Sequence, residues 1–220
     1  MDMADTPQHP TRLVLVRHAV TAETGRVLSG QTKGIDLSAE GRAQAEAVAE
    51  RLSGLPIAAV YASPLERTRQ TAEAIAAPHG LPIVDVPGVI DFDVGEWTGR
   101  ELKELAKDDL WRVIQAAPSR VVFPGGESLA GMQARAVAAL DPIVSAHPGE
   151  LVVVATHADI IKAAVAHYVG LHFDFFQRLV VSPASVTALA FHGPYPMLLA
   201  FNDTGSFDGL KPAEDPEPAS

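Results

Sequence analysis

The 220-residue chain contains no cysteine, and this absence excludes disulfide bonds, thiolate zinc sites and a cysteine nucleophile. Long apolar runs are also absent, since no stretch approaches the ~20 apolar residues of a membrane span. Residues 1–12 lack the apolar core of a secretory signal. We therefore expect a cytoplasmic protein that makes no membrane contact.

Positive charge is scarce, with 17 Lys and Arg against 27 Asp and Glu and a formal net charge of -10. Nucleic acids and anionic membranes bind to clustered basic residues, and the sequence contains no such cluster. Both partner classes are therefore disfavoured. A small anionic substrate remains compatible with this composition, because it needs only a few cations at one place.

Hydrophobic residues make up 47% of the chain, which is enough for one buried core in a protein of this length. We expect a single domain over residues 12–204. A flexible N-terminus is expected at residues 1–11, and a flexible tail rich in proline and acidic residues at residues 205–220. The sequence leaves the oligomeric state open.

Short apolar runs alternate with longer segments of helical periodicity. The apolar runs predict strands at residues 13–16, 57–61, 83–86, 151–155, 186–191 and 197–201. Helices are predicted at residues 38–52, 64–77, 100–116, 128–146 and 159–169. This alternation predicts a three-layer α/β fold, in which a mostly parallel sheet is flanked by helices on both faces.

Three helix boundaries carry specific predictions. Ser38 is placed to cap the first helix. The segment Ser63-Pro64-Leu65-Glu66 has the pattern of a capping box with proline at the first helical position. Pro142 lies inside a predicted helix and is expected to kink or divide it.

Cationic and imidazole side chains follow the predicted strands. Arg17 and His18 end the first strand, Arg67 lies in the first turn of the helix after the second, and His157 follows the fourth. The carboxyl ends of parallel strands meet at one edge of a sheet, so we expect these groups to converge there. Two arginines, two imidazoles and a helix N-terminus suit phosphoryl transfer, in which an imidazole attacks phosphorus and fixed donors stabilise the charge. The leaving oxygen also requires a carboxylic acid on a nearby loop.

The segment LVLVRHAVT resembles the opening RHG motif of the histidine phosphatase superfamily, the phosphoglycerate mutase-like proteins. Five further segments resemble the family's later motifs in the same order, and the resemblance covers about residues 12–200. They are LSAEGRAQAEAVAERL, YASPLERTRQTAEAI, IDFDVGEWTG, FPGGES and VVVATHADII.

The resemblance implies a phosphoglycerate mutase-like fold and a metal-independent phosphomonoesterase of the histidine acid phosphatase type. Such an enzyme needs no cofactor and hydrolyses a small phosphorylated substrate through phosphohistidine. It assigns His18 as the nucleophile, with Arg17, Arg67 and His157 binding the phosphoryl group. Counting back four residues from Gly95 assigns Asp91 as the general acid, with Asp93 and Glu96 as alternatives. The loop that contacts the substrate phosphate or its neighbours would contain Thr24, Ser29, Gly30 and Gln31.

The sequence departs from the family pattern at several places. Ala19 and Val20 replace the Gly and the Glu or Gln that commonly follow the nucleophile, and a methyl group at Ala19 fits if its φ is negative. Asp159 stands where glycine is frequent, and its carboxylate is expected to cap the next helix or to raise the pKa of His157, with the cap favoured. Aspartate in place of glutamate at Asp91 shortens the reach of the acid.

Three alternatives to hydrolysis through phosphohistidine stay open. The first is a mutase of the same family, which returns the phosphoryl group to another hydroxyl. The second is a non-catalytic domain that senses a phosphorylated metabolite or phosphohistidine and needs no Asp91. The third is a metal-dependent hydrolase using His157 and Asp159, although one such pair is a weak metal signature. The substrate itself is not identified by the sequence.

Overall fold

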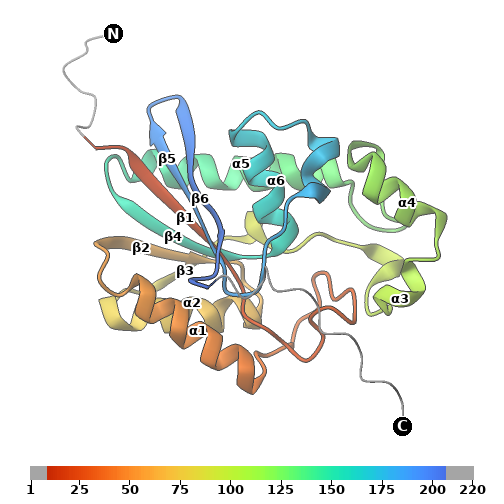
Figure 1. The fold of residues 1–220 in the computed structure, drawn as a ribbon, viewed down its shortest axis with the longest axis horizontal. Coiled ribbons are helices and arrows are strands. Elements are labelled where there is room, and N and C mark those ends of the chain that lie inside the picture. Colours follow the sequence, from red (N-terminus) through yellow and green to blue (C-terminus); the bar gives the residue numbers. More distant parts are fainter. Residues whose placement is uncertain (1–8, 207–220) are drawn as a thin grey trace.

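Six strands form one sheet between two layers of helices in the computed structural model, which describes residues 9–206 (Figure 1). The strand order is β3-β2-β4-β1-β5-β6. The pairs β1–β4, β2–β4 and β2–β3 are parallel, whereas β5 and β6 are antiparallel additions at one edge. The predicted α/β fold with a mostly parallel sheet is confirmed. The bounds are β1 Thr11–Arg17, β2 Ile57–Ala62, β3 Ile83–Asp85, β4 Leu151–Thr156, β5 Val186–His192 and β6 Tyr195–Asp203.

Each face of the sheet is covered by one pair of helices. Successive side chains of a strand point to opposite faces, and β4 shows this most clearly because all its residues are buried. Val152 and Val154 join the core under α5 (Leu129–Ala146) and α6 (Ala158–Tyr168). Leu151, Val153 and Ala155 join the core under α1 (Ala39–Leu52) and α2 (Glu66–Ala76). Burial on both faces explains why the strands read as continuous apolar runs.

The remaining helices lie at the side of the sheet toward which β1 and β4 run (Figure 1). The predicted helix at 100–116 is two helices, α3 (Leu102–Leu105) and α4 (Asp109–Ala116). The division falls at Asp108, whose side chain accepts a hydrogen bond from Leu110 N and so starts a new helix. Short 3-10 turns lie at Ala77–His79, Pro87–Val89, Gly95–Trp97, Pro118–Arg120 and Phe173–Arg178.

The predicted start of the second helix is wrong. Helix α2 begins at Glu66, after Leu65, and no side chain caps it, so the predicted capping box does not form. The hydroxyl of Ser63 bonds to a histidine of another element instead. Of the two outcomes expected at Pro142, division of the helix does not occur, because α5 runs on from Leu129 to Ala146 with Leu140 and Ile143 buried in the core. A kink at Pro142 stays a prediction. The cap at Ser38 is confirmed, with its hydroxyl accepting from Gly41 N.

The carboxyl ends of three parallel strands meet at one edge of the sheet. Arg17 of β1 pairs with Thr156 of β4, and Ala62 of β2 pairs with Ala155. The residues that follow these strands therefore leave the sheet side by side. The expected flexible ends include residues 1–8 and 207–220, which lie outside the described residues. No helix within residues 9–206 is long and apolar enough to cross a membrane.

Candidate active site

His18 is the first residue after β1, and its backbone N–H donates to the carbonyl of Thr156 at the end of β4. Its ring lies at 2.8 Å through Nδ1 from the carbonyl oxygen of Ala19. A carbonyl only accepts hydrogen bonds, so Nδ1 carries the proton and Nε2 keeps its lone pair. The local backbone thus selects the tautomer in which Nε2 can attack an electrophile.

Burial keeps this imidazole neutral. His18 is 7% exposed, and burial, together with the guanidinium groups of Arg67 and Arg17, lowers its pKa to about 3. The bond to Ala19 opposes this shift only in part. At neutral pH the ring is therefore an uncharged base with a free lone pair, as a nucleophile requires.

The second imidazole, that of His157, follows β4 and lies with its ring centroid 5.3 Å from that of His18. Its Nε2 is 2.8 Å from the hydroxyl of Ser63, and its buried Nδ1 has no hydrogen-bond partner. Burial, followed by the proximity of His18 and the arginines, lowers the pKa of His157 well below its ordinary value. When Ser63 donates to Nε2, the neutral ring presents Nδ1–H as a donor to the site.

The two arginines are held by backbone carbonyls. Arg67 is 2% exposed and donates to the carbonyls of Gly30 at 2.7 Å and Thr32 at 3.1 Å. Arg17 donates through one terminal nitrogen to the carbonyl of Val181 at 2.6 Å, and its buried Nε has no partner. Both side chains line the same cavity as His18. Fixed guanidinium donors around a neutral imidazole form an arrangement suited to a phosphoryl group.

Asp91 is the carboxyl group of this site. Its Oδ2 lies 3.3 Å from a terminal nitrogen of Arg67 and 3.4 Å from Nδ1 of His157. Burial raises the pKa of Asp91 to about 6; Arg67 opposes the shift and Asp159 adds to it. This acid therefore holds its proton to a higher pH than an ordinary aspartate does, which suits a proton donor. Asp93 and Glu96, the alternative donors, do not line the cavity.

Arg135 and Glu127 hold the backbone around Asp91 in place. Sequence analysis did not single out either residue. All five N–H donors of Arg135 are used: two bond to Glu127, two to the carbonyls of Gly88 and Ile90, and one to that of Asp91 at 2.9 Å. Glu127 also accepts from Asp93 N at 2.8 Å. The pair therefore fixes the backbone on both sides of the acid. An arginine and a glutamate eight residues apart carry no sequence signal that separates this role from a surface ion pair.

The PGGES segment and the loop of residues 91–97 lie in close contact, and this contact places Glu127 next to the backbone around Asp91. An added Cβ at Gly126 would lie 2.4 Å from the carbonyl oxygen of Asp93, and one at Gly95 would lie 2.2 Å from that of Pro124. Gly95 also has a φ of +52°, a conformation that favours glycine. The backbones of the PGGES segment and of residues 91–97 can therefore touch only because glycine stands at both positions.

The predicted phosphate loop contributes in different ways. Thr24, Ser29 and Gly30 line the cavity, whereas Gln31 does not. The side-chain amide of Gln31 donates to the carbonyl of Asp91 at 2.9 Å, so it supports the loop that carries the acid. The hydroxyls of Thr24 and Ser29 are bonded to Thr21 and Glu23, respectively. These four residues remain predictions as substrate contacts.

The structure shows the outcome at two positions that depart from the family pattern, Ala19 and Asp159. Ala19 is not among the residues with positive φ, so its methyl group is accommodated as expected. The predicted roles of Asp159 are wrong: His157 occupies the N-cap position of α6, and the pKa of His157 is lowered rather than raised. Asp159 instead pairs with Lys162 at 3.1 Å, one turn along the helix. Within residues 9–206, no three His, Asp or Glu side chains are grouped in a way that would hold a metal ion.

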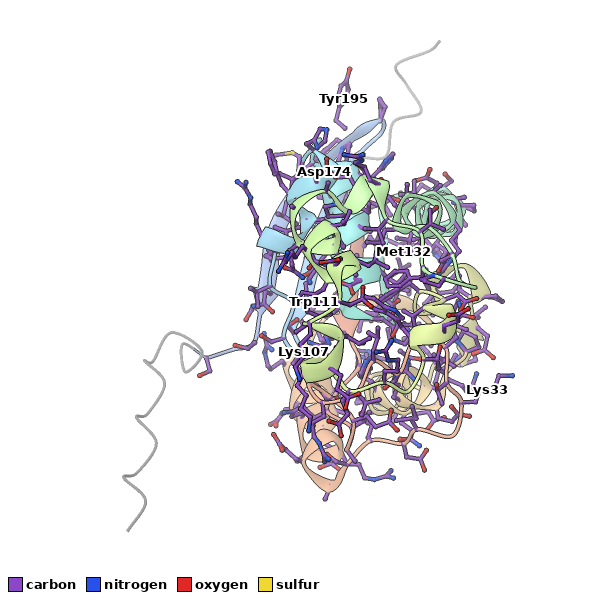
Figure 2. The ribbon with its side chains drawn as sticks, turned by 90° about the vertical axis from the view of Figure 1, so that its right-hand side faces the viewer. Lys33, Lys107, Trp111, Met132, Asp174 and Tyr195 are labelled. Carbon is purple, nitrogen blue, oxygen red and sulfur yellow. The ribbon has the colours of Figure 1, made fainter. Side chains whose placement is uncertain are left out.

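The five predicted catalytic residues line a single cavity of about 370 Å³. They are Arg17, His18, Arg67, Asp91 and His157. The rest of its wall is largely apolar and comes from α3, α4 and the neighbouring loops. Figure 2 shows the side of the molecule that carries these two short helices, with Trp111 of α4 labelled near its middle.

Comparison with known sequences decides the family, because the profile of the histidine phosphatase superfamily (branch 1) matches residues 13–204. The chain belongs to this superfamily. Phosphoserine phosphatase 1 of Hydrogenobacter thermophilus is 32% identical over 88% of this chain and 92% of its own. A probable phosphoglycerate mutase, GpmB of Erwinia tasmaniensis, is 31% identical over 80% of this chain and 83% of its own. The structure of Bacillus stearothermophilus YhfR matches with a TM-score of 0.82 and 27% identity, over 88% of this chain and 97% of that one.

Proposed function

We propose that this protein is a metal-independent phosphomonoesterase that hydrolyses a small phosphate ester through a phosphohistidine on His18. One observation carries the proposal: a neutral imidazole whose Nε2 is free stands beside the buried Arg67, the partly buried Arg17 and a carboxyl group with a pKa of about 6. Membership of the histidine phosphatase superfamily and a phosphatase-named relative support it.

In the first step, Nε2 of His18 attacks phosphorus and the bond from phosphorus to the ester oxygen breaks. Arg17, Arg67 and Nδ1–H of His157 donate hydrogen bonds to the phosphoryl oxygens, on which negative charge is spread. Asp91 gives its proton to the leaving oxygen, which departs as a neutral alcohol. The products of this step are phosphohistidine, the alcohol and an Asp91 carboxylate.

In the second step, the Asp91 carboxylate takes a proton from water, and the water oxygen attacks phosphorus. The bond from phosphorus to Nε2 breaks, which restores neutral His18 and releases inorganic phosphate. Asp91 ends the cycle protonated, as it began. The same carboxyl group thus serves as acid and then as base, for which a pKa of about 6 is well placed near neutrality.

The relatives suggest phosphorylated hydroxy or amino acids as substrates to try, since one is named as a phosphoserine phosphatase and another as a probable phosphoglycerate mutase. A mutase would return the phosphoryl group from His18 to a second hydroxyl instead of to water. Release of inorganic phosphate from 3-phosphoglycerate, without formation of 2-phosphoglycerate, separates hydrolysis from the mutase reaction.

Trapping of phosphohistidine tests the proposal. Asp91→Asn keeps the nucleophile but lacks the base of the second step, so p-nitrophenyl phosphate should leave a phosphoryl group on the peptide that contains His18, measured by mass spectrometry after an alkaline quench. The wild type should turn the same ester over in the presence of EDTA. The proposal is overturned if His18→Ala retains full turnover or if EDTA abolishes the activity of the wild type.

A further inference from the structure

The cavity extends beyond the phosphoryl site, and the extension is lined largely by apolar side chains. A volume of about 370 Å³ is of the size that accommodates a small organic molecule and not a phosphate ion alone. With the phosphoryl group held by the arginines and histidines, the remaining space must receive the leaving alcohol. Apolar side chains line much of this remaining part, among them Trp97, Leu102, Trp111, Ile114, Phe123 and Leu129, together with polar ones such as Thr21, Gln115 and Gln177.

Part of this wall is rigid. Trp97 and Phe123 are each 3% exposed, and their rings pack edge to face with centroids 5.5 Å apart. Phe123 also contacts Phe92, the residue next to Asp91, with centroids 5.4 Å apart. The aromatic rings of Phe92, Phe123 and Trp97 thus form a continuous packed surface that begins next to Asp91. A preformed aromatic surface favours an apolar ligand, because no ordering cost opposes the burial.

Helices α3 and α4 complete the wall at the side shown in Figure 2. Leu102 and Trp111 are only partly buried, although each lines the cavity. Backbone pairing ties this segment to the loop after β1, since Leu28 N donates to Arg100 O and Leu102 N donates to Arg26 O, both at 2.9 Å. The two sides of the cavity are therefore held at a defined separation.

Charge in the cavity argues against a leaving group that carries a carboxylate. Within residues 9–206, the cations that line it are Arg17, Arg67 and Lys162. The two arginines belong to the phosphoryl site. Lys162 already pairs with Asp159 at 3.1 Å and donates a hydrogen bond to the side-chain oxygen of Gln177 at 3.2 Å. A substrate carboxylate would have to displace Asp159, and Asp159 would repel it.

We infer that the substrate of this phosphatase is a phosphate monoester of an uncharged alcohol with a bulky apolar or aromatic group, and that Trp111 is a specificity-determining residue. The inference rests on the proposed function, since it names the substrate class of the same site. Phosphoserine and phosphoglycerates, which the names of the relatives suggest, should then be hydrolysed with a lower kcat/KM than such an ester.

The test compares kcat/KM of the wild type for 2-phenylethyl phosphate, ethyl phosphate and O-phosphoserine. The first two release primary alkoxides and differ in the phenyl group, so their ratio isolates burial of the ring. Full burial of such a group corresponds to about a 10- to 100-fold preference for 2-phenylethyl phosphate. O-Phosphoserine should be turned over no better than ethyl phosphate.

Substitutions on α4 test whether the preference for the 2-phenylethyl ester depends on Trp111. Trp111→Ala should lower the ratio of the 2-phenylethyl to the ethyl ester by about tenfold, whereas Trp111→Phe should retain most of it. Val113→Ala is the matched control, because Val113 is partly buried on the same helix but does not line the cavity, and its ratio should equal that of the wild type. The ratio is independent of the fraction of active enzyme, so loss of folded protein does not mimic the result.

Three outcomes overturn the inference. A wild-type ratio near one, or a higher kcat/KM for O-phosphoserine than for 2-phenylethyl phosphate, would refute the apolar substrate class while leaving the phosphohistidine mechanism intact. A ratio that falls equally in Trp111→Ala and Val113→Ala would remove the role of Trp111. Failure of the wild type to hydrolyse any of these esters or p-nitrophenyl phosphate would instead refute the proposed function.

Discussion

The hydroxyl of Ser63, directly after β2, lies 2.8 Å from Nε2 of His157, directly after β4. The contact connects two neighbouring strand ends and, in the proposed mechanism, determines which nitrogen of the second imidazole carries the proton. Because the pKa of His157 is lowered well below its ordinary value, the ring is neutral at pH 7 and can donate from one nitrogen only. A hydrogen bond from Ser63 to Nε2 directs that proton to Nδ1, on the side of Asp91 and the cavity.

Replacing Ser63 should therefore impair catalysis through the tautomer of His157. We expect Ser63→Ala to lower kcat/KM by about tenfold, the equivalent of one net hydrogen bond. Steady-state assays with p-nitrophenyl phosphate measure the effect. Ser185→Ala is a matched control, since Ser185 is also fully buried but its hydroxyl has no hydrogen-bond partner. Equal losses in the two variants would mean that packing, and not the tautomer, is responsible.

Asp91→Asn removes the proposed proton donor while preserving the size of the side chain. Alkyl phosphates have poor leaving groups, so the variant should lose about 10²- to 10⁴-fold in kcat for enzyme phosphorylation by ethyl phosphate. Nitrophenolate leaves without full protonation, so phosphorylation by p-nitrophenyl phosphate should fall much less. Single-turnover measurements of alcohol release provide both rates. An equal loss with the two esters would assign the proton transfer to another group.

The pH dependence of phosphorylation provides a separate test of the acid. The pKa of Asp91 is raised to about 6, and the donor is active only when protonated. Between pH 7 and 9 the substrate is a dianion throughout and His18 is neutral, since its pKa is about 3. The phosphorylation rate with ethyl phosphate should then fall about tenfold for each pH unit. A wild-type rate that is flat over this range, like that expected of Asp91→Asn, would contradict the assignment.

Arg135 is expected to position Asp91 without touching the substrate. Lysine cannot reproduce its five hydrogen bonds. Arg135→Lys should therefore lower kcat with alkyl phosphates by roughly 10- to 100-fold and leave KM nearly unchanged. The loss should be smaller with p-nitrophenyl phosphate, as for the acid itself. A general loss of folded protein would reduce both activities alike, and Arg112→Lys at an exposed site serves as the reference.

Burial of His18 should make the fold sensitive to acid. Its pKa of about 3 in the folded protein lies below the ordinary value of 6.5, so the unfolded chain takes up a proton first as the pH falls. The stabilisation is complete above pH 6.5 and is lost toward pH 3, by about 1.4 kcal/mol for each pH unit. Urea unfolding of wild type and His18→Gln at pH 6.5 and 4.5 should show that the variant loses about 2.5 kcal/mol less.

The exposed His192 provides the control for this measurement, because its side chain lies at the surface. His192→Gln should lose the same stability as the wild type over that interval. If His18→Gln does so too, the imidazole of His18 is not held neutral by burial.

Much of the site follows from the order of elements along the chain. Buried strands read as apolar runs, and a parallel sheet places the residues after β1 and β4 at one edge, so the meeting of His18 and His157 was predictable. Asp91 was reached by its spacing from Gly95 in a familiar motif. Its loop has no periodic pattern from which a side-chain position could be derived.

Other parts of the site could not be predicted from sequence patterns. The pattern at Ser63 favours a helix cap, but the hydroxyl is buried and bonds to His157, which is distant in the sequence. Arg135 lies on a long helix, where an arginine usually faces water. Nothing in the sequence separates packing from a substrate wall as the role of Trp111, and the fold places this side chain at the cavity. In each case a partner from another element overrides the local preference.

The sequence by itself determined the α/β fold, the family and the residue types at the phosphoryl site, because hydrophobic periodicity and motif spacing are properties of neighbouring residues. Only the tertiary structure decided which nitrogen of each imidazole is hydrogen-bonded, that the pKa of Asp91 is raised to about 6, and that the cavity beyond the five predicted catalytic residues is lined largely by apolar side chains. These properties depend on burial and on contacts between distant segments, which exist only once the chain has folded.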